Sequence, residues 1–315
     1  MHRRQVYALL GITAVGAIVR FATLDVQSFD HDEAVTAVRA LHPSLFDTLS
    51  EVADGERSPP LYYVLAWGWS RIFGTGEVGL RSLSALFGTL TVPLAYLAAR
   101  ALVDRRRIAL LAAAFVALNP YLVWYSQEAR SYALMVLLTT LALVFFARAL
   151  RRPDARSLAL WAAASVLAIG SHYFAVFLIA PQAMWLLARK RGRRQAALAV
   201  VGVLAAGAAL IPLAVSQESS GRRNGFTQIA LVSRVGEAGL NFVASEEPTP
   251  FAATRPIDAV QGLAAAGGGM LLLVAIGLAA TRAPPRSSVA PRSQAPSAPS
   301  RSGCRSCSRS SASTS

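Results

Sequence analysis

The sequence predicts an all-α, polytopic membrane protein with about eight transmembrane helices and one juxtamembrane helix. Two properties of the composition lead to this prediction. The 315 residues are 54% hydrophobic and only 15% charged, whereas a soluble domain carries about 25% charged residues. The charged residues also gather in short clusters, and these leave long uncharged stretches of the length that a helix needs to cross a bilayer.

Eight apolar stretches are candidates for these helices, because a bilayer core of about 30 Å requires roughly 20 apolar residues. The fifth and sixth are short and share a turn at 170–172, so they also fit one hairpin that dips through the membrane. No small-residue cleavage site follows the first stretch, and we expect it to remain as an anchor. The stretches are 5–24, 80–102, 108–124, 131–147, 157–171, 173–188, 195–215 and 259–280.

The segment 61–73 is also apolar, but it is too short to span the bilayer. It is better interpreted as a juxtamembrane or re-entrant helix. Pro59 and Pro60 directly precede it and fix how the chain enters it, since proline has a restricted φ and suits the first turn of a helix.

Basic residues support this threading. If the N-terminus is cytoplasmic, the inner segments hold most of the 31 Lys and Arg and, of the 17 acids, only Asp104 and Asp154. This asymmetry follows the positive-inside rule. The net charge of +14 therefore indicates membrane orientation rather than nucleic acid, which would require a continuous basic face. The inner segments are the N-terminal residues, 100–107, 148–156, 189–194 and the tail after 281.

We expect residues 1–281 to form one membrane module with two long outer loops, 25–60 and 216–257. The first loop carries eight of the 17 acidic residues. Residues 282–315 are rich in Ser, Arg and Pro, so we expect a disordered tail. Its single Cys304-x-x-Cys307 pair is weak evidence for a metal or redox site.

Asp32 and Glu33 follow the first predicted span at the outer surface. Adjacent carboxylates there can serve as a general base or ligate a divalent cation. The alternative is a solvated acidic loop without a site, whose acids only reflect its position on the outer side of the membrane.

Glu128, Arg130 and His172 are the other polar residues that interrupt the apolar pattern on the outer side. Tyr132 suits the headgroup level without any function. The alternatives are an exposed pair for Glu128 and Arg130, which do not face each other on a helix at this spacing, and a structural histidine bonded to backbone.

Five ordered motifs make the chain similar to polytopic glycosyltransferases of the GT-C type. The resemblance covers about residues 25–190 and is strongest to the family-39-like group, which includes protein mannosyltransferases and aminoarabinose transferases. Each motif alone is weak, whereas their order and spacing are specific. The motifs are Asp32-Glu33-Ala34, Ser58-Pro59-Pro60-Leu61-Tyr62-Tyr63, Glu77 through Arg81 to Gly88, Trp124 through Gln127-Glu128-Ala129-Arg130-Ser131-Tyr132 to Leu134, and His172-Tyr173-Phe174-Ala175.

This resemblance implies transfer of a sugar from a polyprenyl-phosphate carrier to a hydroxyl of a protein, lipid or glycan at the outer face of the cell membrane. It places the catalytic carboxylate at Asp32, with Glu33 as its neighbour in the motif. The leaving phosphate needs a fixed cation, for which Arg130 is the first candidate. Donor and substrate binding are further expected from Glu128, Tyr132, His172, Tyr173 and Arg81.

No cofactor is required by the resemblance, although more distant relatives leave open a divalent cation held by Asp32 and Glu128. Relatives usually continue with more helices, whereas the membrane pattern here stops near Ala280, so the chain resembles a truncated or frameshifted member. The alternative function is non-catalytic: a transporter or flippase for lipid carriers, or an inactive relative. A transporter is expected to place ionisable residues near the bilayer midplane, and the predicted spans hold few apart from Arg20.

Overall fold

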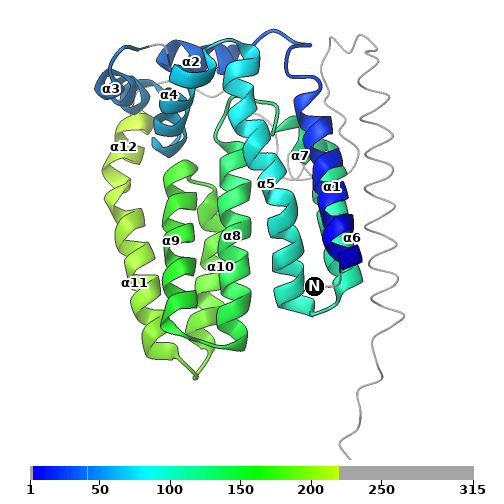
Figure 1. Ribbon diagram of the computed structural model, residues 1–315. Helices are drawn as coiled ribbons and strands as arrows, with labels where there is room; N and C mark the ends of the chain where they lie inside the picture. Colours follow the sequence, from blue (N-terminus) through cyan, green and yellow to red (C-terminus); the bar gives the residue numbers. More distant parts are fainter. Residues whose placement is uncertain (1–2, 41, 220–315) are drawn as a thin grey trace, which may run out of the picture.

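The computed structural model describes residues 3–40 and 42–219, and these form twelve α-helices (Figure 1). The predicted span 259–280, most of the predicted loop 216–257 and the predicted tail 282–315 lie outside the described residues. The helices are α1 (Arg3–Phe21), α2 (His31–Ala40), α3 (Leu45–Gly55), α4 (Leu61–Phe73), α5 (Glu77–Val103), α6 (Arg106–Leu118), α7 (Pro120–Trp124), α8 (Tyr132–Arg151), α9 (Ala155–Ser171), α10 (Ala175–Ala188), α11 (Arg193–Ala209) and α12 (Ile211–Ser219).

Four stretches of helix within the described residues are long and apolar enough to cross a membrane: α1, α5, α8 and the continuous run Arg193–Gln217. This confirms an all-α, multi-pass membrane protein. Helices α9 and α10 are apolar but shorter, with 17 and 14 residues. These four stretches are candidate spans, and the finer count of about eight stays a prediction. The predicted juxtamembrane helix has the bounds expected for it, Leu61–Phe73.

The predicted span 108–124 is divided into α6 and α7, because Pro120 cannot continue the hydrogen bonding of α6. Asn119 caps the new helix, and its Oδ1 accepts a hydrogen bond from the N–H of Leu122 at 2.9 Å. The last carbonyls of α6 lack partners within their own helix. The buried guanidinium of Arg20 in α1 supplies donors to two of them, at Val116 and Ala117.

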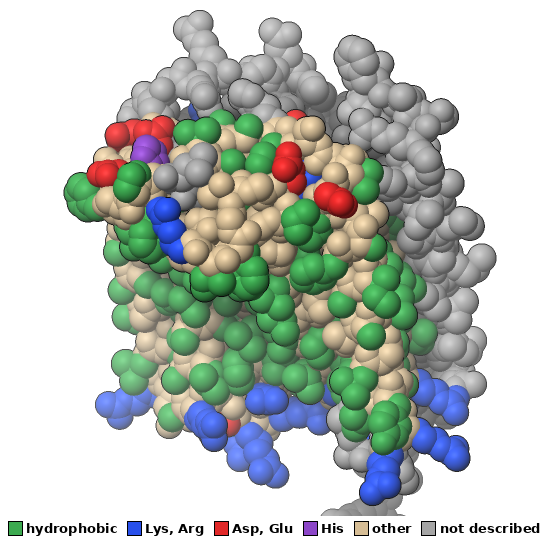
Figure 2. Space-filling view, turned by 45° about the horizontal axis from the view of Figure 1, so that its top comes forward, with side chains coloured by type: hydrophobic (Ala, Val, Ile, Leu, Met, Phe, Trp, Pro, Cys, Tyr) green, Lys and Arg blue, Asp and Glu red, His purple; other side chains and the backbone are tan. Residues whose placement is uncertain are grey.

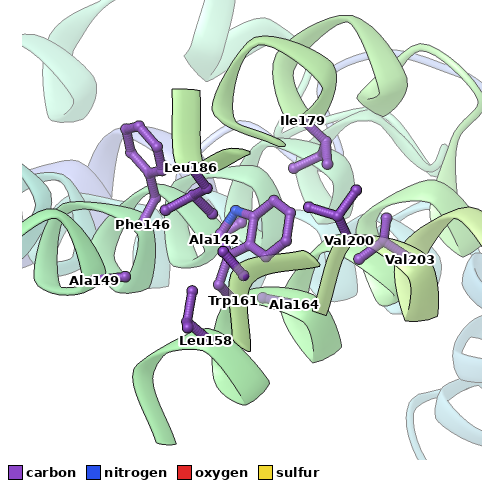
Figure 3. Packing of buried hydrophobic residues seen from close by; sticks show 11 residues of the cluster. Ala142, Phe146, Ala149, Leu158, Trp161, Ala164, Ile179, Leu186, Val200 and Val203 are labelled. Atoms are coloured by element: carbon purple, nitrogen blue, oxygen red, sulfur yellow. The ribbon is translucent and has the colours of Figure 1, made fainter. Parts of the chain in front are cut away.

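The largest buried apolar cluster joins α8, α9, α10 and α11 around Trp161 (Figure 3). Trp161 is completely buried, and its indole N–H donates to Oε1 of Gln182 at 3.0 Å. Ile179, Leu186 and Val200 pack beside the indole ring. This cluster fixes the helices that carry one wall of the site described below.

Charged side chains separate to the two ends of the bundle. Figure 2 shows most of the visible Lys and Arg around the lower end, most of the acidic side chains at the upper end, and a hydrophobic band between them. The lower end carries the basic turns 105–107, 148–156 and 189–194, while α2, α3 and α4 lie at the upper end (Figure 1). The hydrophobic band is the surface that lipid would cover in a multi-pass protein.

Candidate active site

The candidate site lies at the acidic end, where α2, the end of α3 and the segment between α7 and α8 meet. Consecutive residues on a helix point about 100° apart, so Asp32 and Glu33 in the first turn of α2 have different surroundings. The side chain of Asp32 is 65% exposed, whereas that of Glu33 is 5% exposed.

The carboxylate of Glu33 accepts four hydrogen bonds. Two come from the backbone N–H groups of Asp30 at 3.1 Å and Ala129 at 2.8 Å, and two come from Nε and Nη2 of Arg81 at 2.9 and 2.5 Å. Burial acts to raise the pKa of Glu33, but Arg81 and the two backbone donors outweigh burial and lower it. A carboxylate has about four lone-pair positions, so no position is left for a substrate.

Arg81 of α5 is equally occupied. Besides the two bonds to Glu33, its Nη1 donates to the carbonyls of Leu24 and Gln27 at 2.9 and 2.6 Å, and its Nη2 donates to the carbonyl of Ser28 at 3.1 Å. These bonds use all five N–H donors of a guanidinium. The geometry therefore differs from the sequence-based expectation of a catalytic Glu33 and a phosphate-binding Arg81. The pair instead ties the loop before α2 to α5.

Arg130 lies in the segment between α7 and α8, and its side chain is 15% exposed. Its Nη2 is 3.7 Å from Oδ2 of Asp32, and its Nη1 is 3.9 Å from Oε2 of Glu56 and donates to the carbonyl of Asp32 at 3.3 Å. The guanidinium carbon lies 6.0 Å from the ring centre of Tyr132. Burial acts to lower the pKa of Arg130, but the neighbouring Tyr63, Glu56, Tyr132 and Asp32 outweigh it and raise the pKa.

The segment that carries Arg130 is attached to the membrane helices on both sides. Ser84 of α5 donates through Oγ to the carbonyl of Arg130 at 3.3 Å. The Gln127 amide donates to Oγ1 of Thr23 at 2.6 Å and to the carbonyls of Val19 and Arg20 at 3.2 and 3.1 Å. These contacts position the guanidinium relative to α1 and α5.

Glu128 is half-buried beside Arg130 and accepts a hydrogen bond from the indole N–H of Trp124 at 2.8 Å. Burial raises the pKa of Glu128 to about 7, although the Trp124 bond and Arg130 act to lower it. Near neutral pH the side chain is therefore present in both protonation states, and it can donate as well as accept hydrogen bonds.

A run of aromatic rings connects this cluster to the turn between α9 and α10. The ring centroids of Tyr125 and Tyr132 are 4.8 Å apart, and those of Tyr132 and His172 are 5.4 Å apart. Nδ1 of His172 accepts the N–H of Phe174 at 3.1 Å, which assigns the ring proton to Nε2 in the neutral form. Burial and the nearby Arg130 lower the pKa of His172. A neutral imidazole N–H is thus held near the cation.

Tyr173 was expected to bind the donor, but its hydroxyl donates to Oε1 of Gln217 in α12 at 2.9 Å. The amide nitrogen of Gln217 donates in turn to the carbonyls of Val52 and Ser58 at 3.1 and 3.2 Å. Gln217 is 2% exposed. The two residues join α12 to the end of α3, so the geometry assigns Tyr173 to the scaffold.

The structure thus brings together Asp32, Glu128, Arg130, Tyr132 and His172, and it places Glu33, Arg81 and Tyr173 in supporting contacts. Sequence reasoning missed two residues. Glu56 stands directly before the Arg57-Ser58-Pro59-Pro60 stretch and carried no signal beyond that position. Gln217 lies two residues beyond the seventh apolar stretch, 195–215, and its isolated amide was a usable signal. No group of three or more His, Cys, Asp and Glu arranged for a metal occurs among the described residues.

Comparisons with known proteins agree with this architecture. Residues 57–216, about half of the chain, match the family model described as dolichyl-phosphate-mannose-protein mannosyltransferase. The fold is similar to a chain of the S. cerevisiae protein O-mannosyltransferase Pmt1-Pmt2 complex bound to the sugar donor, with a TM-score of 0.51 and 18% identity. The match covers 72% of this chain and 38% of the yeast chain. No curated protein matches significantly.

Proposed function

This chain belongs to the dolichyl-phosphate-mannose-protein mannosyltransferase family, and on that premise we propose that it transfers a sugar from a polyprenyl-phosphate carrier to an acceptor hydroxyl. The sugar is a hexose such as mannose, or a pentose, and the acceptor is a protein, lipid or glycan. The observation that carries the proposal is the contact between an exposed carboxylate, Asp32, and a largely buried guanidinium, Arg130.

Asp32 is the proposed general base. Its carboxylate takes the proton of the acceptor hydroxyl while that oxygen forms a bond to the anomeric carbon of the sugar. The bond from this carbon to the phosphate oxygen breaks, and its electron pair leaves with the polyprenyl phosphate. Attack from the side opposite the phosphate inverts the anomeric configuration. Exposure of the carboxylate is consistent with access for an acceptor that arrives from water.

Arg130 is the proposed partner of the leaving phosphate. A guanidinium presents paired N–H donors that match two phosphate oxygens, and charge grows on the phosphate in the transition state. The neutral His172 offers an Nε2–H donor close by, and Tyr132 lies between the two residues. Glu128, with a pKa of about 7, is proposed to hydrogen-bond sugar hydroxyls.

The proposed topology places the acidic end at the outer face of the cell membrane and the N-terminus in the cytoplasm. The separation of charges along the bundle supports this orientation. A prenyl chain in the bilayer then brings its phosphate to the level of Arg130. The count of eight spans, the module 1–281 with its outer loops 25–60 and 216–257, and a divalent cation at Asp32 and Glu128 stay predictions.

The test is sugar transfer from polyprenyl-phosphate mannose by the full chain, compared with its Asp32→Asn variant. Loss of the base is expected to lower the rate by about 100-fold or more, while membrane insertion is unchanged. Asp47→Asn, which neutralises an exposed acid of α3, serves as the matched control. Transfer at the wild-type rate by Asp32→Asn would remove Asp32 from the base role. Donor binding without transfer by the unmodified chain would favour a carrier-binding protein instead.

A further inference from the structure

Arg130 contacts two carboxylates that differ in their exposure to water. The side chain of Asp32 is 65% exposed and that of Glu56 is 7% exposed, while the two distances to Arg130 are similar, 3.7 and 3.9 Å. Glu56 follows α3 directly, and its backbone N–H donates to the carbonyl of Val52 at 3.1 Å. Arg130 is thus shared between a buried acid at a fixed place and an exposed acid.

We propose that Glu56 is a positioning residue that keeps Arg130 in the site while a donor phosphate displaces Asp32 from it. This inference rests on the proposed function. In the empty site the Asp32 carboxylate lies against Arg130, with its Oδ2 3.7 Å from Nη2. When the phosphate takes the place of Asp32, the carboxylate becomes available to the acceptor. The base is therefore released only after the donor has bound.

The difference in burial decides which carboxylate leaves. Asp32 regains hydration as soon as it separates from Arg130, because most of its side chain already faces water. The side chain of Glu56 is only 7% exposed, so its charge would gain little hydration in exchange for the lost contact with Arg130, which is unfavourable. The backbone contributes as well, since Nη1 of Arg130 also donates to the carbonyl of Asp32. That bond does not depend on the Asp32 carboxylate and can persist when the carboxylate moves.

The first experiment tests the pairing without any need for activity. Melting temperatures are measured for the purified full chain and for Glu56→Gln, Arg130→Gln and the double variant. Each single change is expected to lower the melting temperature by about 3 °C. The double variant should lose less than the sum, because each change removes the partner of the other. Asp54→Asn, an exposed acid of the same helix end, is the control and should leave the value unchanged. Additive effects would overturn the pairing.

The second experiment measures the KM for polyprenyl-phosphate mannose and for the acceptor. In Glu56→Gln, Arg130 loses one of the two carboxylates that it contacts among the described residues. Its contact with Asp32 then becomes tighter, and the donor must break that tighter pair. The KM for the donor should rise about 10-fold, or about 1.4 kcal/mol, with the KM for the acceptor unchanged. Glu56→Asp, which keeps the charge, should lie closer to wild type than Glu56→Gln. If Glu56 only filled space, Glu56→Gln would have the donor KM closer to wild type, because Gln has the size of Glu and Asp does not.

A lower donor KM in Glu56→Gln would mean that Glu56 only repels the anionic donor, and it would overturn the proposal. Absence of transfer by the unmodified chain would instead contradict the proposed function. The melting temperatures of the single and double variants would still decide whether Glu56 holds Arg130, so the two failures are distinguishable.

Discussion

Asp32 and Glu33 are adjacent in the chain, and each pairs with its own arginine in a different manner. Glu33 and Arg81 are buried, and the two side chains use all their donors and lone pairs on each other and on backbone groups. Asp32 is exposed and contacts Arg130 at 3.7 Å. An ion pair whose donors and lone pairs are all in use, here called saturated, is not easily displaced by a ligand. A longer, partly exposed pair leaves room for one. The comparison therefore separates a pair that supports the site from the pair to which the proposed function assigns the chemistry.

The largest effect is expected when the saturated pair is broken. Glu33→Gln removes the charge that Arg81 faces, and it replaces one oxygen acceptor by an NH₂ group that confronts N–H donors. Loss of one partner of a buried ion pair costs about 3–5 kcal/mol. We expect a chain that melts far below wild type or fails to purify, as measured by thermal unfolding in detergent. Asp32→Asn is the internal comparison and should melt like wild type. Equal melting temperatures of Glu33→Gln and Asp32→Asn would contradict the proposed difference between the two ion pairs.

A smaller and more specific effect is expected from Arg130→Lys. Lysine keeps the positive charge but loses the paired donors that fit two phosphate oxygens. The KM for the lipid-linked donor should rise about 10-fold to 100-fold, while the KM for the acceptor stays near wild type. Steady-state kinetics with each substrate varied in turn measures this separation. An unchanged donor KM would exclude Arg130 as the phosphate partner and would leave the Asp32 contact without its proposed use.

Sequence patterns predicted much of the fold because membrane helices can be recognised by their length and apolar content. The juxtamembrane helix 61–73 was predicted from an apolar run too short to span, and its bounds agree with α4. The break at Asn119 and Pro120 was missed, although proline provides the reason for it. A buried arginine from α1 supports that break, and such a partner almost 100 residues away is invisible to local patterns.

Sequence patterns predicted which residues would lie near the site, but not which contacts each of them would make. The meeting of Asp32 with Arg130 was expected from ordered motifs, and the contact is present. The resemblance placed the catalytic carboxylate at Asp32, but residue patterns alone could not show that Glu33 is buried against Arg81, which lies in a different helix. Glu56 was one of several acids in the same loop. Only its distance to Arg130 and its burial distinguish it from Asp54.

The smallest expected effect concerns a third acid, Glu128, which has neither the saturated contacts of Glu33 nor the exposure of Asp32. Its pKa is raised to about 7 by burial in the folded chain, against about 4.3 in an unfolded one. The folded state therefore holds the proton more tightly, and the stability that Glu128 contributes is present below about pH 4.3 and decreases as the pH rises towards 7. Glu128→Gln does not titrate. Its melting temperature relative to wild type should therefore be higher at pH 8 than at pH 5, and a difference that stays constant over this range would mean that the carboxyl is not desolvated.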